Sequence, residues 1–187
     1  MHFQSLSIAE VKLITPRKFG DSRGYFSEVF KDIWFRRNVA DVGLVQDNES
    51  LSAQIGTVRG LHFQLEPFAQ GKLVRCTRGA LFDVAVDVRV GSPTYGKWVS
   101  AELSQENGAQ LWVPAGFAHG FMTLQADTVI NYKVSAPYSA EHDRGLKWDD
   151  PAVGINWPKM TAYVLSEKDS RQPSLCELPV SFQYLKV

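Results

Sequence analysis

Short runs that alternate between apolar and polar residues dominate the middle of the chain. In the clearest run, residues 81–89, the apolar side chains of Phe82, Val84, Val86 and Val88 fall on one face of an extended chain. Alternation with a period of two predicts a β-strand. Similar runs predict five more strands, over residues 57–65, 72–78, 97–103, 110–113 and 129–134.

Glycine-rich turns separate these strands. They lie at Gly79, at 91–93, at 106–108 and at Ala115-Gly116. Many short strands at near-regular spacing are typical of a β-sandwich or barrel. Helix is scarce: residues 31–39 predict one short helix that ends near Gly43, and the tail after Ala152 leaves room for one or two helical turns. We therefore predict an all-β, two-sheet jelly roll with a few short peripheral helices.

Composition bounds the class of protein. The 187 residues suit a single domain spanning 1–187, and an apolar fraction of 44% with a charged fraction of 21% is ordinary for a globular protein. The 20 Lys+Arg balance the 20 Asp+Glu. A nucleic-acid partner calls for a basic face, so we expect no nucleic acid. Any phosphate recognition must be local.

The two cysteines and the N-terminal residues bear on location. Cys76 and Cys176 lie far apart without the spacing of a metal site, so we expect reduced thiols. Residues 1–13 contain no uninterrupted apolar core, and no stretch is long and apolar enough to span a bilayer. We expect no signal peptide, no membrane partner and a cytoplasmic location.

Two spaced patterns resemble the conserved motifs of the cupin superfamily, whose fold is a double-stranded β-helix jelly roll. The first pattern consists of Gly56, His62-Phe63-Gln64, Lys72 and Gly79, and the second of Gly108, Pro114, Gly116 and His119. His62, Gln64, Lys72 and His119 would then occupy the four metal-ligand positions. A Gln amide is a poor ligand for a transition metal, and a Lys ammonium repels a cation. We therefore expect no metal here, and an ammonium that can stabilise an enolate or hold a phosphate.

Longer strings resemble a single family within this superfamily. They are 19–26 (FGDSRGYF), 46–48 (QDN), 59–64 (RGLHFQ), 70–75 (QGKLVR), 114–121 (PAGFAHGF) and 166–169 (SEKD). Together they are similar to dTDP-4-dehydrorhamnose 3,5-epimerases, the isomerases of the third step of dTDP-L-rhamnose biosynthesis. The resemblance implies a homodimer, in which N-terminal elements of one subunit complete the other's pocket, and no metal or redox cofactor.

The resemblance also implies roles for individual residues. His62 is expected as the general base, paired with Asp169, Tyr132 as the acid on the opposite face of the sugar, and Lys72 as the cation near the enolate. The expected contacts to substrate and nucleotide are Arg23, Phe26, Glu28, Gln46, Asn48, Arg59, His119, Tyr138, Glu141 and Lys168. For Phe26, and for its neighbour Tyr25, burial in the core is an equally good interpretation.

These residue types suit the implied substrate, dTDP-4-dehydro-6-deoxy-D-glucose. Protons on C3 and C5 both flank the C4 ketone, so one base and one enolate stabiliser can serve both carbons. An imidazole titrates near neutral pH, and a carboxylate behind it fixes its tautomer. A proton returned from the other face inverts the carbon.

Two further expectations come from the residues alone. Asp83 lies on the polar face of the clearest strand, where it either is solvated or orients Lys72 or His62. Arg59 and His62 are three residues apart, so a regular strand would point them to opposite faces. Because both should reach one substrate, we predict a β-bulge or kink at Gly60.

Three alternatives stay open at this point. A relative of the same family can epimerise only one carbon. A metal-dependent cupin oxygenase or isomerase would need different residues at positions 64 and 72. A jelly roll that binds a sugar or nucleotide without catalysis would not need a His, an Asp, a Tyr and a Lys in one pocket.

Overall fold

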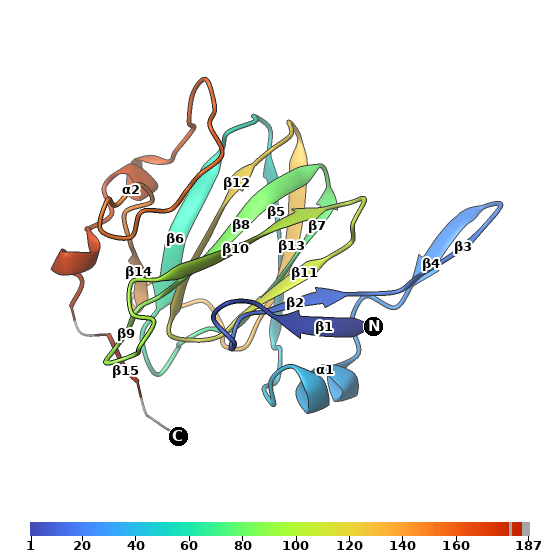
Figure 1. Cartoon of the computed structure of the whole chain (residues 1–187), viewed down its shortest axis with the longest axis horizontal. Coiled ribbons are helices and arrows are strands. Elements are labelled where there is room, and N and C mark those ends of the chain that lie inside the picture. The colour runs from blue at the N-terminus through green and yellow to red at the C-terminus, as the bar shows by residue number, and fades with distance from the viewer. Residues whose placement is uncertain (180, 185–187) are drawn as a thin grey trace.

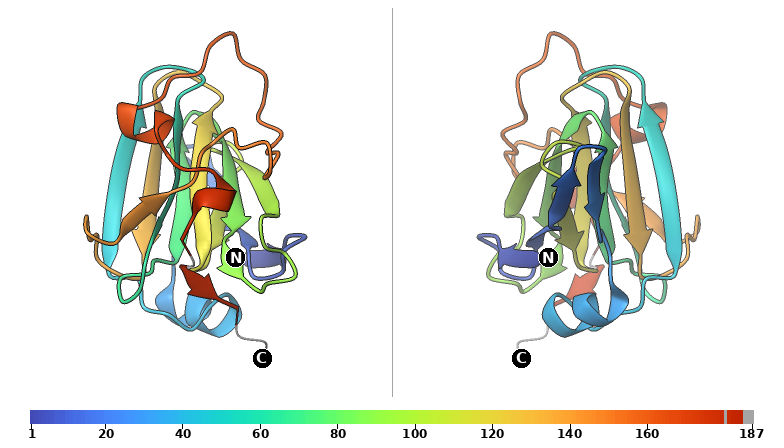
Figure 2. Two further views of the ribbon diagram at one scale, coloured as in Figure 1. Left: turned by 90° about the vertical axis from the view of Figure 1, so that its left-hand side faces the viewer. Right: turned by 90° about the vertical axis from the view of Figure 1, so that its right-hand side faces the viewer.

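Two antiparallel β-sheets stacked face to face form the body of the protein (Figures 1 and 2). The structure, a computed structural model, describes residues 1–179 and 181–184. In spatial order, the six-stranded sheet comprises β1 (His2–Ser5), β2 (Lys12–Thr15), β11 (Gln110–Val113), β7 (Lys72–Arg78), β13 (Thr128–Val134) and β5 (Gln46–Ser52). The five-stranded sheet comprises β10 (Trp98–Ser104), β8 (Ala80–Asp87), β12 (Phe117–Thr123), β6 (Val58–Gln64) and β14 (Asp143–Gly145). The predicted jelly roll is confirmed.

Smaller elements lie around these sheets. The hairpin of β3 (Lys18–Asp21) and β4 (Gly24–Ser27) projects from the body, and β9 (Arg89–Val90) pairs in parallel with β15 (Phe182–Gln183) (Figure 1). The helical segments are α1 (Asp32–Asn38), α2 (Glu167–Ser170) and the 3-10 turn η1 (Leu175–Glu177). The predicted short helices are thus confirmed, although α1 ends well before Gly43. No helix in the described ranges is long and apolar enough to cross a membrane.

The space between the sheets holds the main core. Buried side chains from β7, β8, β10, β11, β12 and β13 meet there, and they include Val74, Leu81, Leu103, Leu111 and Phe117. Burial of each such side chain contributes about 1.5–3 kcal/mol to folding. Every second residue of a strand points to the same face of its sheet. The strand faces that supply this core therefore also carry the polar residues that point into the interior at one end.

Both faces of β8 are buried, contrary to the expected solvated face. Val84 and Val86 lie on the outer face, where Leu146, Trp157 and Leu175 from the C-terminal part of the chain pack over them. Asp83 and Asp87 point into the interior and are 0% exposed. The solvated interpretation of Asp83 is therefore wrong, because its face of the strand is the inside of the jelly roll.

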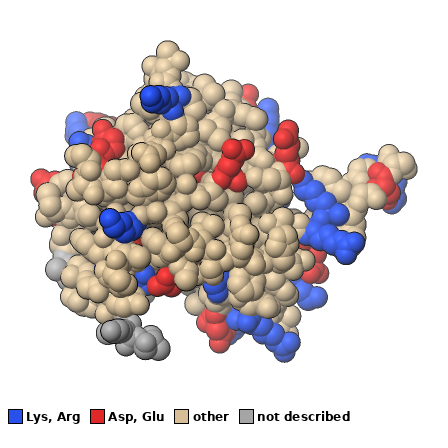
Figure 3. All heavy atoms as spheres, in the orientation of Figure 1, with Lys and Arg blue, Asp and Glu red and all other residues tan. Residues whose placement is uncertain are grey.

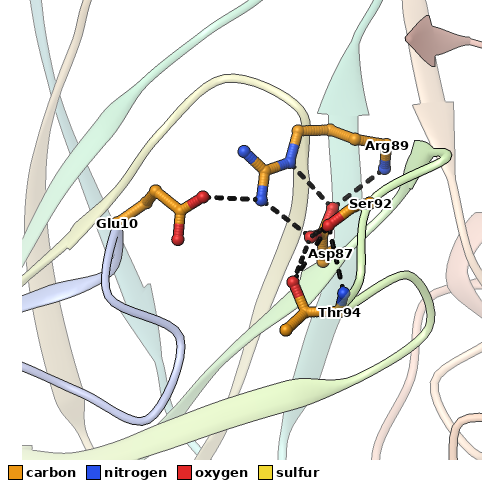
Figure 4. A network of polar contacts seen from close by, with 5 residues as sticks. All are labelled: Glu10, Asp87, Arg89, Ser92 and Thr94. Carbon is orange, nitrogen blue, oxygen red and sulfur yellow. Dashed lines mark hydrogen bonds and ion pairs between the residues drawn. The ribbon is translucent and has the colours of Figure 1, made fainter. Parts of the chain in front are cut away.

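Asp87 is stabilised by a network of hydrogen bonds at the opposite end of β8 (Figure 4). The Arg89 guanidinium donates to both carboxylate oxygens, at 2.9 and 2.7 Å, and the Ser92 and Thr94 hydroxyls each donate at 2.6 Å. Burial alone would raise the pKa of Asp87, but these hydrogen bonds outweigh it and lower the pKa. Arg89 also binds Glu10, at 3.1 Å, so the network ties the loop after β1 to this end of the five-stranded sheet.

The predicted bulge at Gly60 is present. Opposite Arg59 and His62 on β6, which are three residues apart, β12 has Phe121 and His119, which are only two apart. The extra residue allows Arg59 and His62 to line one cavity. Gly60 has φ +117°, and a Cβ there would lie 2.7 Å from the Cα of Gly120. Only glycine fits this backbone contact.

The β3–β4 hairpin exposes an unusual amount of aromatic surface. Phe19, Tyr25 and Phe26 are 50%, 60% and 71% exposed. The core interpretation of Tyr25 and Phe26 is therefore wrong.

Figure 3 shows acidic and basic side chains interspersed over one face of the body, with basic ones gathered where the hairpin arm begins.

Replacing Gly60 by alanine tests the importance of the bulge. Gly60→Ala combines an unfavourable φ with overlap against backbone, so we expect a loss of about 2–4 kcal/mol in the free energy of unfolding. Gly43→Ala is the matched control, because nothing lies within 4 Å of a Cβ at Gly43. Urea unfolding of both variants measures the difference, and equal midpoints would refute the close-contact argument.

Candidate active site

A cavity of about 470 Å³ opens at the polar end of the jelly roll. Strands β5, β6, β7, β12 and β13 supply its walls, and the segment that leads into α2 borders it. Its lining residues are Ser50, Thr57, Val58, Arg59, His62, Lys72, His119, Phe121, Ile130, Tyr132, Val164, Leu165, Ser166, Lys168 and Asp169. The four predicted catalytic residues are therefore brought together, with Arg59, His119 and Lys168 beside them.

His62 and Asp169 form a short pair in this cavity. The Nε2 atom of His62 lies 2.5 Å from Oδ1 of Asp169. Ser166 caps α2 by accepting a hydrogen bond from the Asp169 backbone N–H, which fixes the carboxylate relative to β6. Burial alone would raise the pKa of Asp169, but the hydrogen bond and charge of His62 outweigh it and lower the pKa. An ionised Asp169 favours the proton on Nε2, which leaves the lone pair of His62 on Nδ1.

Lys72 points into the same cavity from β7. Its residue is 9% exposed, and Nζ donates to the backbone carbonyl of His62 at 3.2 Å. Burial lowers the pKa of this ammonium to about 8, against the opposing charges of Asp143 and Asp83. A buried ammonium with protons to spare can stabilise negative charge on a ligand oxygen.

Tyr132 and Arg59 lie on facing strands. Burial raises the pKa of the Tyr132 phenol, opposed by the charge of Arg59, so the phenol keeps its proton at neutral pH. Arg59 is held by hydrogen bonds from Nε to Ser52 Oγ and from Nη2 to the Leu51 carbonyl, both at 3.0 Å. Tyr132 thus brings a protonated phenol into a cavity that also contains the His62 imidazole and the cations of Arg59, Lys72 and Lys168.

Asp83 hydrogen-bonds to His119, not to Lys72 or His62 as expected. Oδ1 of Asp83 lies 2.7 Å from Nε2 of His119, and both side chains are buried. The cavity therefore contains two His–Asp pairs, and His62 and His119 face each other across β6 and β12. The predicted orienting role of Asp83 was assigned to the wrong partner.

Asp143 is a residue that the sequence patterns missed. Its carboxylate binds Nζ of Lys168 and accepts a hydrogen bond from the Tyr138 hydroxyl at 3.3 Å. It thus orients two of the predicted contact residues, whereas the predicted Glu141 is exposed and does not line the cavity. No spacing rule separates Asp143 from Glu141: Glu141 lies in the loop before β14 and Asp143 is the first residue of that short strand.

Strand β5 reaches the cavity at Ser50, whereas the predicted contacts Gln46 and Asn48 lie on the same face of the strand but do not line the cavity. Gln46 donates to Asn48 at 2.8 Å, and its Oε1 accepts from the backbone N–H of Tyr138. The buried hydroxyl of Ser50 lines the cavity and has no hydrogen-bond partner among the described residues. Ser50 was not predicted, because a lone serine between Glu49 and Leu51 carries no sequence signal.

The N-terminal contact residues are not brought to this cavity within the chain. Arg23 pairs with Asp21 at the tip of the projecting hairpin, and Phe26 lies on β4. Glu28 lies beyond β4, 3.9 Å from Lys31. All three side chains are exposed and none lines the cavity.

The four cupin ligand positions are occupied by side chains with other partners. Gln64 donates to the carbonyls of Phe68 and Pro137 and accepts from the Ser139 N–H, so its amide is fully used by the backbone. Lys72 presents an ammonium at the next position. The described part of the chain contains no group of three or more His, Cys, Asp or Glu that could hold a metal ion.

Comparisons with known proteins agree with this geometry. The family model for dTDP-4-dehydrorhamnose 3,5-epimerase matches residues 5–177. The curated dTDP-4-dehydrorhamnose 3,5-epimerase of Sinorhizobium fredii is 92% identical over 187 residues, which cover 100% of this chain and 96% of the relative.

Solved structures of epimerases share the fold. The dTDP-6-deoxy-D-glucose-3,5-epimerase of Legionella pneumophila, in complex with dTDP-4-keto-L-rhamnose, superposes with a TM-score of 0.94 at 40% identity over 99% of each chain. ChmJ, a 3'-monoepimerase from Streptomyces bikiniensis in complex with dTDP-quinovose, gives a TM-score of 0.86 at 33% identity, over 92% of this chain and 87% of ChmJ.

The burial of Lys72 has a measurable consequence. Because the buried ammonium is less favourable than an exposed one, we expect Lys72 to titrate near pH 8, with its pKa lowered to about 8. NMR of the protein labelled at lysine Cε and Nζ can follow this titration, and Lys72→Arg assigns the signal. A Lys72 midpoint near the ordinary lysine value of about 10.4 would contradict the burial argument.

Proposed function

The chain belongs to the dTDP-4-dehydrorhamnose 3,5-epimerase family, and we propose that its cavity inverts C3 and C5 of dTDP-4-dehydro-6-deoxy-D-glucose by acid–base chemistry. His62 acts as base, Tyr132 as acid and Lys72 as the enolate stabiliser. The main support is the His62–Asp169 pair, at 2.5 Å, in one cavity with Lys72 and Tyr132. The product is dTDP-4-dehydro-L-rhamnose, and the chain is an epimerase of the dTDP-rhamnose pathway.

Proton removal begins the reaction. Nδ1 of His62 takes the proton from C3 or C5, because Nε2 is engaged with Asp169. The C–H electron pair becomes the C=C bond of an enolate, and the C4 carbonyl electrons move onto oxygen. Asp169 stabilises the imidazolium that results. General base catalysis of this kind contributes about 100–10,000-fold.

The enolate oxygen needs a positive partner in a site with little water. Lys72 Nζ is buried and donates one hydrogen bond to the His62 carbonyl, so its other protons can hydrogen-bond to the substrate oxygen. Preorganised charge in such a site is worth more than it would be in water. Most of the remaining acceleration comes from this stabilisation and from positioning.

Tyr132 completes the inversion. Its phenol, whose pKa burial raises, delivers a proton to the face of the carbon opposite His62. The C=C electron pair forms the new C–H bond, and an electron pair on the enolate oxygen restores the C4 carbonyl. The phenolate then regains a proton from solvent, and His62 releases its own. The same groups act on the second carbon, since both carbons flank the ketone.

The substrate contacts are divided between two subunits in our proposal. Arg59, His119, Lys168, Gln46 and Asn48 belong to the pocket of one chain. The exposed hairpin that bears Arg23 and Phe26, together with Glu28, inserts into the pocket of the second subunit of a homodimer. Exposed aromatic surface of this size is typical of an interaction site. The hairpin would supply a guanidinium for the diphosphate and an aromatic face for the base.

A single-carbon epimerase is the second candidate, because the structure of the monoepimerase ChmJ has the same fold. The described geometry contains both acid and base, which either outcome needs. The cytoplasmic location stays a prediction based on the nucleotide-sugar substrate.

Solvent exchange separates these candidates. In deuterated water we expect deuterium to enter both C3 and C5 of dTDP-4-dehydro-6-deoxy-D-glucose, and NMR of the sugar can follow this exchange. His62→Asn should slow exchange at both carbons by about 100–10,000-fold, because it removes the base. His2→Asn, on the exposed strand β1, should have no effect. Exchange at one carbon would indicate a monoepimerase, and exchange at neither would refute the mechanism.

Mixed dimers test the shared pocket. One subunit carries His62→Asn and the other carries Arg23→Ala with Phe26→Ala. If each hairpin serves the partner's pocket, one pocket of the mixed dimer has every group intact. Activity per mixed dimer should then reach about half of the wild-type value, far above either parent dimer. No recovery would mean that the hairpin does not act across subunits.

A further inference from the structure

The Asp83–His119 pair lies outside the acid–base steps described above. Asp83 comes from β8, in the middle of the five-stranded sheet, and His119 from the neighbouring strand β12. His119 lines the cavity, whereas Asp83 lies behind it and is 0% exposed. Asp83 cannot contact a substrate directly, so any influence on the reaction must pass through its neighbours.

Asp83 is only half satisfied by hydrogen bonds. Oδ1 binds Nε2 of His119 at 2.7 Å, whereas the buried Oδ2 has no partner among the described residues. Burying a carboxylate costs several kcal/mol unless nearby groups compensate it. The buried Asp87 on the same strand shows full compensation, with donors on both oxygens. The contrast indicates that the burial of Asp83 has a reason other than stability.

The titratable groups near Asp83 identify that reason. Besides His119, its charge acts on Lys72 and on the thiol of Cys76, both on β7. The charges that act on Lys72 are those of Asp143, Asp83 and Lys168. Asp143, the larger of the two acidic influences on Lys72, is paired with Lys168. Asp83 is paired with His119, and its Oδ2 is the one buried carboxylate oxygen without a hydrogen-bond partner among the described residues.

We propose that Asp83 is a positioning residue for this end of the cavity, which orients the His119 ring through Nε2 and keeps Lys72 in its ammonium form. This inference rests on the proposed function, because that function needs a cationic Lys72. With Nε2–H donated to Asp83, His119 presents the lone pair of Nδ1 as an acceptor for a hydroxyl of the bound sugar. One anion thus orients one side chain and favours the charged form of another.

The decisive variant is Asp83→Asn, which keeps the shape and removes the charge. The NMR titration of Lys72 should move to lower pH by about 0.5 or more, because loss of a nearby anion disfavours the ammonium. The descending limb of kcat/KM at alkaline pH should move with it. The affinity for dTDP alone should stay within about 3-fold, because in this proposal Asp83 acts through His119 and Lys72 on the sugar and not on the nucleotide.

Asp87→Asn is the matched control, since Asp87 is another fully buried carboxylate on the same face of β8. It should lower stability and leave the Lys72 titration unchanged. If Lys72 titrates alike in wild type and in Asp83→Asn, the proposal is wrong.

The wild-type protein supplies a second test should Asp83→Asn fail to fold. Nitrogen NMR of neutral His119 should show the proton on Nε2, and the opposite tautomer would refute the orienting role. The Lys72 titration and the nitrogen NMR of His119 need no turnover, so their outcomes do not depend on the proposed function. Absence of solvent exchange in the wild type would overturn the function, whereas an unchanged Lys72 titration would overturn only the role of Asp83.

Discussion

The backbone contact between Gly60 and Gly120 is the constraint on which the site depends. Neither residue has a side chain, so β6 and β12 approach closely enough that a Cβ on either glycine would lie within 2.8 Å of the other strand's backbone. The extra residue that β6 accommodates there reverses its alternation between Arg59 and His62. Without the bulge, one of these two side chains would point out of the cavity.

The second constraint is the balance of charge inside the jelly roll. The charges of Asp83 and Asp143 act on Lys72, and Asp169 lines the same cavity. Each of these three carboxylates is committed to a different hydrogen-bonded partner. An unpaired charge at this depth would lose its proton or gain one. Distribution of the carboxylates over three elements therefore allows a base, an ammonium and a phenol to coexist in a cavity of about 470 Å³.

Alternation along the chain predicted the strands whose two faces differ in environment. Strands β7 and β11 have the predicted bounds. Strand β12 gave no signal because all seven of its residues are buried, and β5 gave none because its inward face is polar where it borders the cavity. Alternation in the sequence arises where one face of a strand contacts water and the other contacts the core. It therefore fails to predict a strand that is buried on both faces or one whose inward face borders a polar site.

The site residues divide along a similar line. Those in long motifs, such as His62 and Lys72, could be placed from the sequence, whereas Asp143 and Ser50 act through contacts that only the folded chain creates. The partner of Asp83 could not be predicted either, because the register between β8 and β12, which places it diagonally from His119, is a long-range property. Spacing in the sequence indicates which residues carry reactive groups. Which carboxylate hydrogen-bonds to each of them depends on the folded chain. In this chain, two histidines on neighbouring strands are each held by an aspartate from a different element, and in the second pair the aspartate lies behind the cavity while the histidine lines it.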